Sequence, residues 1–128
     1  MESKPHRLGD LQLQILQILW QRPGIPVSDV HETLKPRRDL AYTTVATMLR
    51  KMEARGLVSH REEGRAFLYS ASIAEAEVHQ QAGEHLIDRL FEGSIADAVS
   101  HLLRSREVSR TELDTLEKLI RDAKRRAK

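Results

Sequence analysis

The residues best suited to contacting a charged partner lie in one stretch, residues 41–56, which reads AYTTVATMLRKMEARG. At about 100° per residue, a helix here has Ala41 and Tyr42 on its packed side, together with the valine, leucine and methionines. The opposite side carries short hydroxyls and then cations: Thr43, Thr44, Thr47, Arg50, Lys51, Ala54 and Arg55. Threonine is a mediocre helix former, and no carboxylate joins this side because Glu53 points sideways. Hydroxyls and cations together bind phosphates and base edges, so the pattern predicts contact with an anionic partner.

Other candidate chemistry is weak. His79 and His85 are six residues apart and therefore lie on different helix faces. Residues 31–35, HETLK, begin like the zinc-protease motif HExxH, but Lys35 stands where the second ligand is needed. The sequence contains no cysteine, phosphate-binding loop, nucleophile elbow or dinucleotide fingerprint. We therefore expect no metal, no cofactor and no enzymatic activity.

Length and composition fit a small protein that does not enter a membrane. The 128 residues suffice for one domain, or one small domain with an appended element. No apolar run approaches the roughly 18 residues of a membrane span, and the first residues, MESKPHRLGD, lack the apolar centre of a signal peptide. A cytoplasmic protein without membrane insertion is expected.

Positive charge is concentrated around the threonine-bearing helix. The formal net charge is only +2. Residues 1–71 hold 11 Lys or Arg against 8 Asp or Glu, whereas residues 72–128 hold 10 against 11. Within residues 35–65 there are eight basic and four acidic residues, the distribution expected of a nucleic-acid contact.

The first half of the chain has the element order of a winged helix-turn-helix domain. Apolar periodicity predicts a helix over 10–22, and Ser28 is expected to cap a second helix that ends at Leu34, after an extended connector over 25–27. Gly56 is the expected stop of the third helix. Strand-like runs over 57–62 and 66–71, around a turn at 63–65, predict a hairpin that forms the wing.

The second half is predicted to be helical. A capping box at Ser72 predicts a helix over about 73–91, and one at Ser109 predicts a helix over about 110–125. A weaker capping box at Ser94 predicts a helix over about 95–104. The tail, residues 124–128, is predicted to be disordered. The helices are one-sided and too short to be stable alone, so packing against a second copy is expected. The candidate dimerisation residues are Leu86, Leu90, Ile95, Val99, Leu102, Leu103, Leu113, Leu116, Leu119 and Ile120. The fold class is therefore mainly α with a small β-hairpin wing, with a DNA-binding domain at 1–71 and a three-helix dimerisation region at 72–128.

Four segments together resemble the BlaI/MecI/CopY family of penicillinase-type transcriptional repressors: LGDLQLQILQILW, LAYTTVATMLRKMEARGLV, GRAFLYSA and LFEGSIADAVSHLL. The resemblance implies a homodimeric cytoplasmic repressor of an inverted-repeat operator of TACA/TGTA type. The DNA contacts that it implies are Tyr42, Thr43, Thr44, Thr47, Arg50, Lys51 and, at the wing, Arg65.

The chain departs from known members of that family at two places. Copper-responsive members carry C-terminal cysteine pairs, which are missing here, so copper sensing is not expected. Antibiotic-responsive members are inactivated, through a membrane sensor metalloprotease, by cleavage of an Asn–Phe bond in the dimerisation helix. The corresponding position reads His101-Leu102, which is the candidate cleavage position in this chain.

Other interpretations stay open. Winged helices also act as protein-interaction modules, which would require exposed apolar anchors on the third helix. A small-molecule-sensing regulator would need a pocket, for which the short helical tail offers little room. Arg37 and Arg38, in the basic turn before the third helix, either contact phosphates or only solvate the turn.

Overall fold

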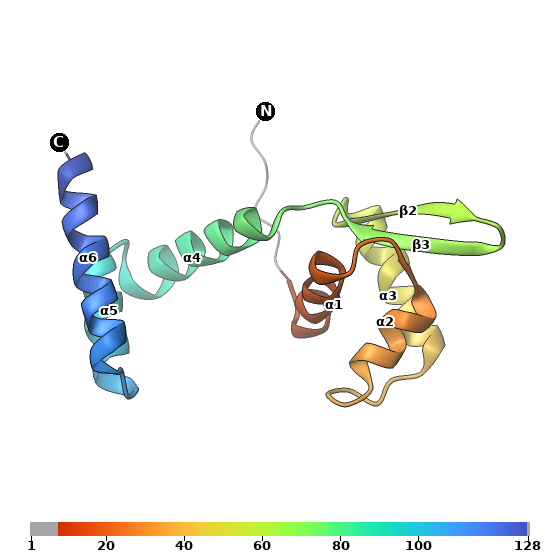
Figure 1. The fold of residues 1–128 in the computed structure, drawn as a ribbon, viewed down its shortest axis with the longest axis horizontal. Helices are drawn as coiled ribbons and strands as arrows, with labels where there is room; N and C mark the ends of the chain where they lie inside the picture. The colour runs from red at the N-terminus through yellow and green to blue at the C-terminus, as the bar shows by residue number, and fades with distance from the viewer. Residues whose placement is uncertain (1–7, 128) are drawn as a thin grey trace. The chain divides into compact units, whose positions relative to one another are not determined.

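The computed structural model describes residues 8–127, and this part of the chain forms six helices and one small sheet (Figure 1). The elements are α1 (Asp10–Gln21), β1 (Ile25–Pro26), α2 (Val27–Leu34), α3 (Tyr42–Ala54), β2 (Val58–Glu63), β3 (Ala66–Ala71), α4 (Glu75–Phe91), α5 (Ile95–Ser105) and α6 (Arg110–Arg126). The predicted fold class, mainly helical with a small hairpin wing, is confirmed. The chain divides into two compact units between Gly83 and Glu84, which lies within α4.

The core of the N-terminal unit is built from the apolar faces of its first three helices. The helical residues that are at most 2% exposed are Ile15, Leu16, Leu19, Val30, Leu34, Val45, Leu49 and Met52. Leu57, Val58 and Tyr69 join them from the hairpin region, and Ile73 and Val78 from the chain that follows it. Burying one large apolar side chain contributes about 1.5–3 kcal/mol, so this cluster fixes how α3 is rotated about its axis.

The sheet has the strand order β1-β3-β2, and both pairs are antiparallel. In the wing, Val58 lies opposite Ala71 and Glu63 opposite Ala66, which leaves Gly64 and Arg65 as a two-residue loop. Gly64 has φ +64°, the positive angle that the first position of such a loop requires. The predicted hairpin therefore forms, with a turn one residue shorter than expected.

The predicted extended connector over 25–27 is extended at Ile25 and Pro26, but these two residues also pair with β3 as a third strand, and Val27 already belongs to α2. Pro26 has no backbone N–H to donate, which suits it to the edge of the sheet. Pro26 is also the N-cap residue of α2, so Ser28 lies in the first turn of that helix instead of capping it.

Two of the three predicted helix caps form in the second half of the chain. The Ser94 and Ser109 hydroxyls each accept a hydrogen bond, of 3.1 Å, from the third residue of α5 and α6 respectively. Ser72 is not the cap of α4, because that helix begins at Glu75. Its N–H donates to the Leu57 carbonyl at 2.8 Å and Ile73 is buried, so the segment continues from the sheet.

The tail was predicted to be disordered from residue 124, and this is wrong through residue 126. α6 continues to Arg126, and the Ala127 N–H donates to the Ala123 carbonyl at 3.0 Å. Three cations in the last turn favour the helix because they lie at the negative end of its dipole. Lys128 lies outside the described residues.

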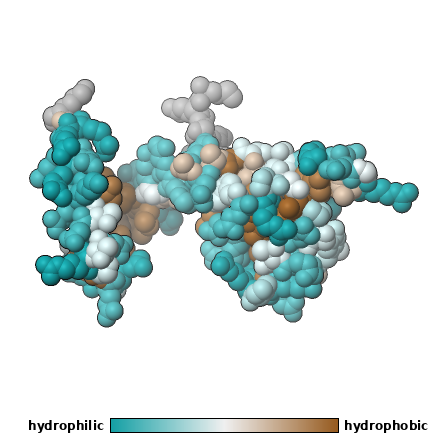
Figure 2. Space-filling view, viewed as in Figure 1, coloured by the Kyte–Doolittle hydropathy of each residue, from teal (hydrophilic) through white to brown (hydrophobic). Residues whose placement is uncertain are grey.

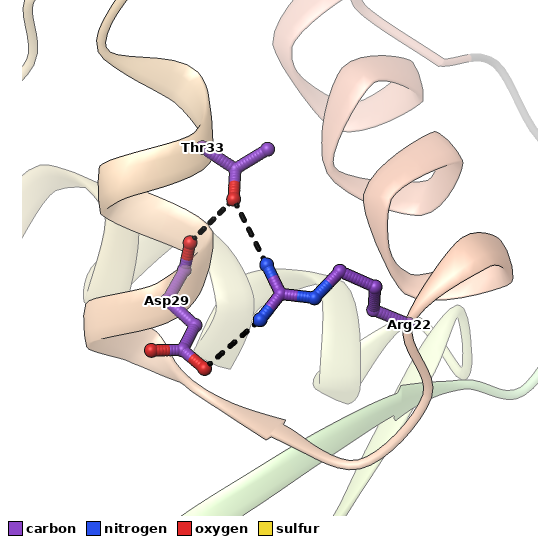
Figure 3. Close-up of polar contacts among 3 residues, drawn as sticks. All are labelled: Arg22, Asp29 and Thr33. Atoms are coloured by element: carbon purple, nitrogen blue, oxygen red, sulfur yellow. Dashed lines mark hydrogen bonds and ion pairs between the residues drawn. The ribbon is translucent and has the colours of Figure 1, made fainter.

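Arg22 links the end of α1 to α2 (Figure 3). Its guanidinium donates to the Thr33 hydroxyl at 3.3 Å and pairs with the Asp29 carboxylate at 3.2 Å. The Thr33 hydroxyl donates in turn to the Asp29 carbonyl at 2.8 Å. All three residues are partly exposed, so the cluster contributes orientation more than stability.

The C-terminal unit, residues 84–128, exposes much of its apolar surface. Among its described residues only Ala98 is buried. Of the candidate dimerisation residues Leu116 is half-buried, and the others are between 37% and 67% exposed in the single chain. Hydrophobic residues are visible on the surface of this unit in Figure 2. Across residues 8–127, none of the helices combines the length and the apolar character needed to cross a membrane.

Candidate nucleic-acid interface

The rotation of α3 decides which of its side chains face outward. Val45, Leu49 and Met52 are fully buried at its inner face. The outward face consequently carries Thr43, Thr44, Thr47, Arg50 and Lys51, of which Thr47 is half-buried and the others are exposed. Ala41, the N-cap, and Tyr42 are also exposed, so their predicted position on the packed side is wrong. Ala41 precedes the helix and Tyr42 is its first residue, and the core does not enclose this end of α3.

The outward face is hollowed and lined by hydroxyls and a cation. Thr43, Thr44, Thr47 and Lys51 surround one shallow depression with Met48 at its side. The Arg50 guanidinium lies beside it and donates to the Thr47 hydroxyl at 3.1 Å. Because the threonine side chains are short, the backbone of α3 lies close to any molecule that binds in this depression.

Glu53 does not weaken this positive face, because its carboxylate is turned toward the wing. Both of its oxygens lie within 2.8 Å of His60 Nδ1 on β2. The His60 ring stacks on Phe67 of β3, with the ring centroids 4.2 Å apart. This link is not predictable from the sequence, because its three residues come from three elements and no short motif joins them.

A groove runs between α3 and the wing, and two of its lining residues are cationic. Arg50 contributes from α3 and Arg65 from the hairpin loop, together with Tyr42, Ser28 and Phe67. Tyr69 lies at the inner end of the groove, where burial raises the pKa of its hydroxyl above 10.0. Glu53 raises this pKa further, while Arg50 lowers it, and the group is neutral at physiological pH. The groove therefore presents cations and neutral hydroxyls, a combination suited to a phosphate backbone.

Two other cations near α3, Arg38 and Arg55, secure the fold. The half-buried Arg38 donates through Nε to the Gln14 side chain at 2.8 Å, which ties the basic turn to α1. Arg55 donates to Gln12 at 3.1 Å and ties the end of α3 to the same helix. Arg37 is exposed. Of the two arginines in the turn, Arg38 consequently has a structural role.

The HETLK stretch forms two local contacts instead of a metal site. His31 Nε2 lies 2.7 Å from the Leu40 carbonyl oxygen, and Glu32 pairs with Lys35 at 3.1 Å. Within residues 8–127, no cluster of three or more histidine, aspartate and glutamate side chains is arranged to hold a metal ion.

Comparison with known proteins points to one protein family. The family model described as penicillinase repressor matches residues 8–122. The penicillinase repressor of Bacillus licheniformis is 24% identical over 126 residues, which cover 98% of this chain and 98% of that protein. The transcriptional regulator BlaI of Mycobacterium tuberculosis is 37% identical over 99 residues, or 77% of this chain and 63% of that protein.

A solved structure has the same fold as the N-terminal part of the chain. The solution structure of monomeric BlaI from Bacillus licheniformis, in complex with the blaP half-operator, superposes with a TM-score of 0.50 and 27% identity. The matched region covers 58% of this chain and 90% of the BlaI chain.

Proposed function

The chain belongs to the penicillinase repressor family of DNA-binding transcriptional repressors, and we propose that it acts as a homodimer on an inverted-repeat operator of TACA/TGTA type. The observation that carries the proposal is the outward face of α3, where threonines and cations surround a shallow depression without a carboxylate. Operator binding would take place in the cytoplasm.

In this proposal each subunit reads one half-site with α3. Thr44 and Thr47 face the base edges, where hydroxyls accept or donate hydrogen bonds and methyl groups contact thymine methyls. Lys51 and Arg65 bind phosphates on either side, one from the helix and one from the wing loop. Tyr42, Thr43 and Arg50 complete the contact. The BlaI structure with a half-operator supports DNA binding by this domain, because a protein of similar fold is there in complex with DNA.

The second half of the proposal concerns the dimer. The C-terminal unit exposes nine large apolar side chains that were predicted from periodicity. Monomeric proteins rarely leave so many large apolar side chains exposed on so short a segment, and a second copy of the same unit is the simplest cover for them. Each operator half would then be held by one subunit of a joined pair.

Repression would be relieved by an event that damages this interface. The candidate cleavage position, His101-Leu102, lies in α5 with both side chains exposed. A membrane sensor metalloprotease, or a process that it starts, is the upstream partner that the family suggests. Cutting α5 would separate the residues of the interface without touching the DNA-binding face.

The alternative, a protein-interaction module, finds less support. Of the large hydrophobic side chains on α3, only Tyr42 is clearly exposed. A helix that docked on a protein would present apolar anchors along its length.

Fluorescence anisotropy with two labelled duplexes tests the proposal. One duplex carries an inverted TACA/TGTA repeat, and the other has the same bases in scrambled order. We expect about a thousandfold preference for the repeat at physiological salt. The logarithm of the association constant should fall with the logarithm of salt concentration, with a slope of about −0.9 per phosphate neutralised. Equal affinity for the two duplexes, or affinity independent of salt, would contradict operator binding.

A further inference from the structure

His31 connects α2 to the segment that leads into α3. His31 is half-buried on α2, and Val30 and Leu34 of the same helix are buried in the core. Its Nε2 lies 2.7 Å from the carbonyl oxygen of Leu40, two residues before α3 begins. A carbonyl oxygen only accepts hydrogen bonds, so Nε2 carries the proton and donates.

The segment that His31 holds has few other backbone bonds. Residues 39–41 belong to no helix or strand. The Leu40 N–H donates to the Arg38 carbonyl at 3.1 Å, and the Ala41 carbonyl accepts from the N–H groups of Thr44 and Val45. The contact with His31 consequently ties the start of α3 to a helix that is anchored in the core.

The same imidazole also touches the first residue of α3. The rings of His31 and Tyr42 meet edge to face, with their centroids 5.9 Å apart and an angle of 81° between their planes. Tyr42 lines the groove that also contains Arg50 and Arg65. One side chain thus contacts both the backbone before α3 and an aromatic ring on the proposed DNA-binding surface.

We propose that His31 is a positioning residue for DNA recognition, which fixes the first turn of α3 and the ring of Tyr42 without contacting DNA. The inference rests on the proposed function of α3. It also explains the HETLK stretch: His31 holds Leu40, and Glu32 pairs with Lys35 at the surface. No metal is required for either contact.

The hydrogen bond does not depend on the charge of the imidazole. Both the neutral ring with its proton on Nε2 and the charged ring donate from the same atom. A glutamine at this position places an amide N–H close to where Nε2 lies, whereas a leucine fills space without a donor. His31→Gln should therefore rescue what His31→Leu loses.

Operator affinity of full-length variants tests the inference. His31→Leu should weaken binding to the inverted repeat about threefold per subunit, thus about tenfold for a dimer on two half-sites, as expected for one net hydrogen bond in each. His31→Gln should restore most of the affinity. Glu32→Gln, which removes only an exposed ion pair on the neighbouring residue, is the matched control and should bind like wild type. Wild-type affinity of His31→Leu, or no rescue by His31→Gln, overturns the inference.

Hydrogen exchange of the free protein separates this inference from the proposed function. In His31→Leu the amides of Thr44 and Val45, in the first turn, should exchange at least several times faster than in wild type, while those of Leu49 and Met52 change little. This readout decides the role of His31 even if the wild-type protein does not prefer the inverted repeat, which would count against the proposed operator alone. Unchanged exchange at Thr44 and Val45 would show that His31 does not hold the start of α3.

Discussion

Thr47 and Arg50 share a hydrogen bond, so their contributions to DNA binding should depend on each other. The Arg50 guanidinium donates to the Thr47 hydroxyl at 3.1 Å, which orients both groups before DNA arrives. In a double-mutant cycle on operator binding, Thr47→Ala and Arg50→Ala should therefore be non-additive by about 0.5 kcal/mol or more. Thr47→Ala combined with Arg65→Ala is the control cycle and should be additive. Additive behaviour of the first pair would mean that the bond does not persist on DNA.

Lys51 and Arg65 should behave differently from the threonines. Thr44→Ala and Thr47→Ala remove groups that face base edges in the proposed complex, and each should reduce the preference for the inverted repeat over scrambled duplex. Lys51→Ala and Arg65→Ala should instead weaken binding to both duplexes alike. Each should reduce the magnitude of the salt slope by about one per neutralised phosphate. Salt titrations of the four variants check this, and a loss of specificity in Lys51→Ala would contradict its assignment to a phosphate.

At the level of single residues, the periodicity of the sequence predicts which side of a helix a residue faces better than it predicts which residue it contacts. The outward position of Thr43, Thr44 and Lys51 followed from the burial of every third or fourth residue on the opposite side. Tyr42 was misassigned because periodicity assumes a core that extends beside the first turn. The pairing of Glu53 with His60 joins two elements and depends on the angle between them, which no local pattern contains.

At the level of elements, the helices were predictable because each buries a stripe several residues long. β1 was missed because two residues show no periodicity and their partners on β3 lie more than 40 positions away. Ser72 matched a capping pattern, yet burial of Ile73 outweighs a single cap and delays the start of α4. Local signals thus predict an element well where no tertiary contact competes with them.

Two glycines should respond in opposite ways to alanine substitution. Gly56 ends α3 with φ +77°, an angle that costs an L-residue about 1–2 kcal/mol, although a Cβ would meet no atom within 4 Å. Gly83 lies inside α4 with open space around it and no positive φ, where alanine favours the helix by about 0.5–1 kcal/mol. Urea unfolding, followed by the fluorescence of the single tryptophan, Trp20, should show a lower midpoint for Gly56→Ala and a higher midpoint for Gly83→Ala. An unchanged midpoint for Gly56→Ala would indicate that the turn relaxes.

At the level of the whole molecule, the two units differ in how completely each buries its apolar residues. The N-terminal unit has a closed core, which its own sequence predicted. The C-terminal helices were predicted equally well, yet their apolar faces remain exposed in one chain. In the proposed dimer a second chain covers those faces, and neither propensity nor periodicity predicts the geometry of that contact.

Leu102→Asp should abolish tight operator binding without altering the DNA-binding surface. Leu102 is 48% exposed in the single chain, so an aspartate there leaves the monomer folded. In the proposed dimer, the carboxylate would be buried without a partner once in each subunit, at a cost of several kcal/mol each. Light scattering should show a monomer at micromolar concentration, and anisotropy should show that the operator is held no more tightly than a half-site.

Ser100→Asp is the matched control for this substitution. It adds the same charge to α5 at an exposed polar position away from the apolar stripe, and both dimer and operator affinity should survive. A monomeric wild-type protein, or a monomeric Leu102→Asp that still binds the full repeat tightly, contradicts the proposed assembly.

The exposed apolar faces of the C-terminal unit also determine how sharply a gene under this repressor would respond to dosage. If subunits must pair before they occupy the operator, occupancy at low abundance rises with the square of the subunit concentration. Halving the supply of chain would then lower occupancy about fourfold, where a monomeric repressor would lose only half. A brief pause in synthesis, or dilution by one round of cell growth, would consequently lower the occupancy of the operator more steeply than it lowers the amount of protein.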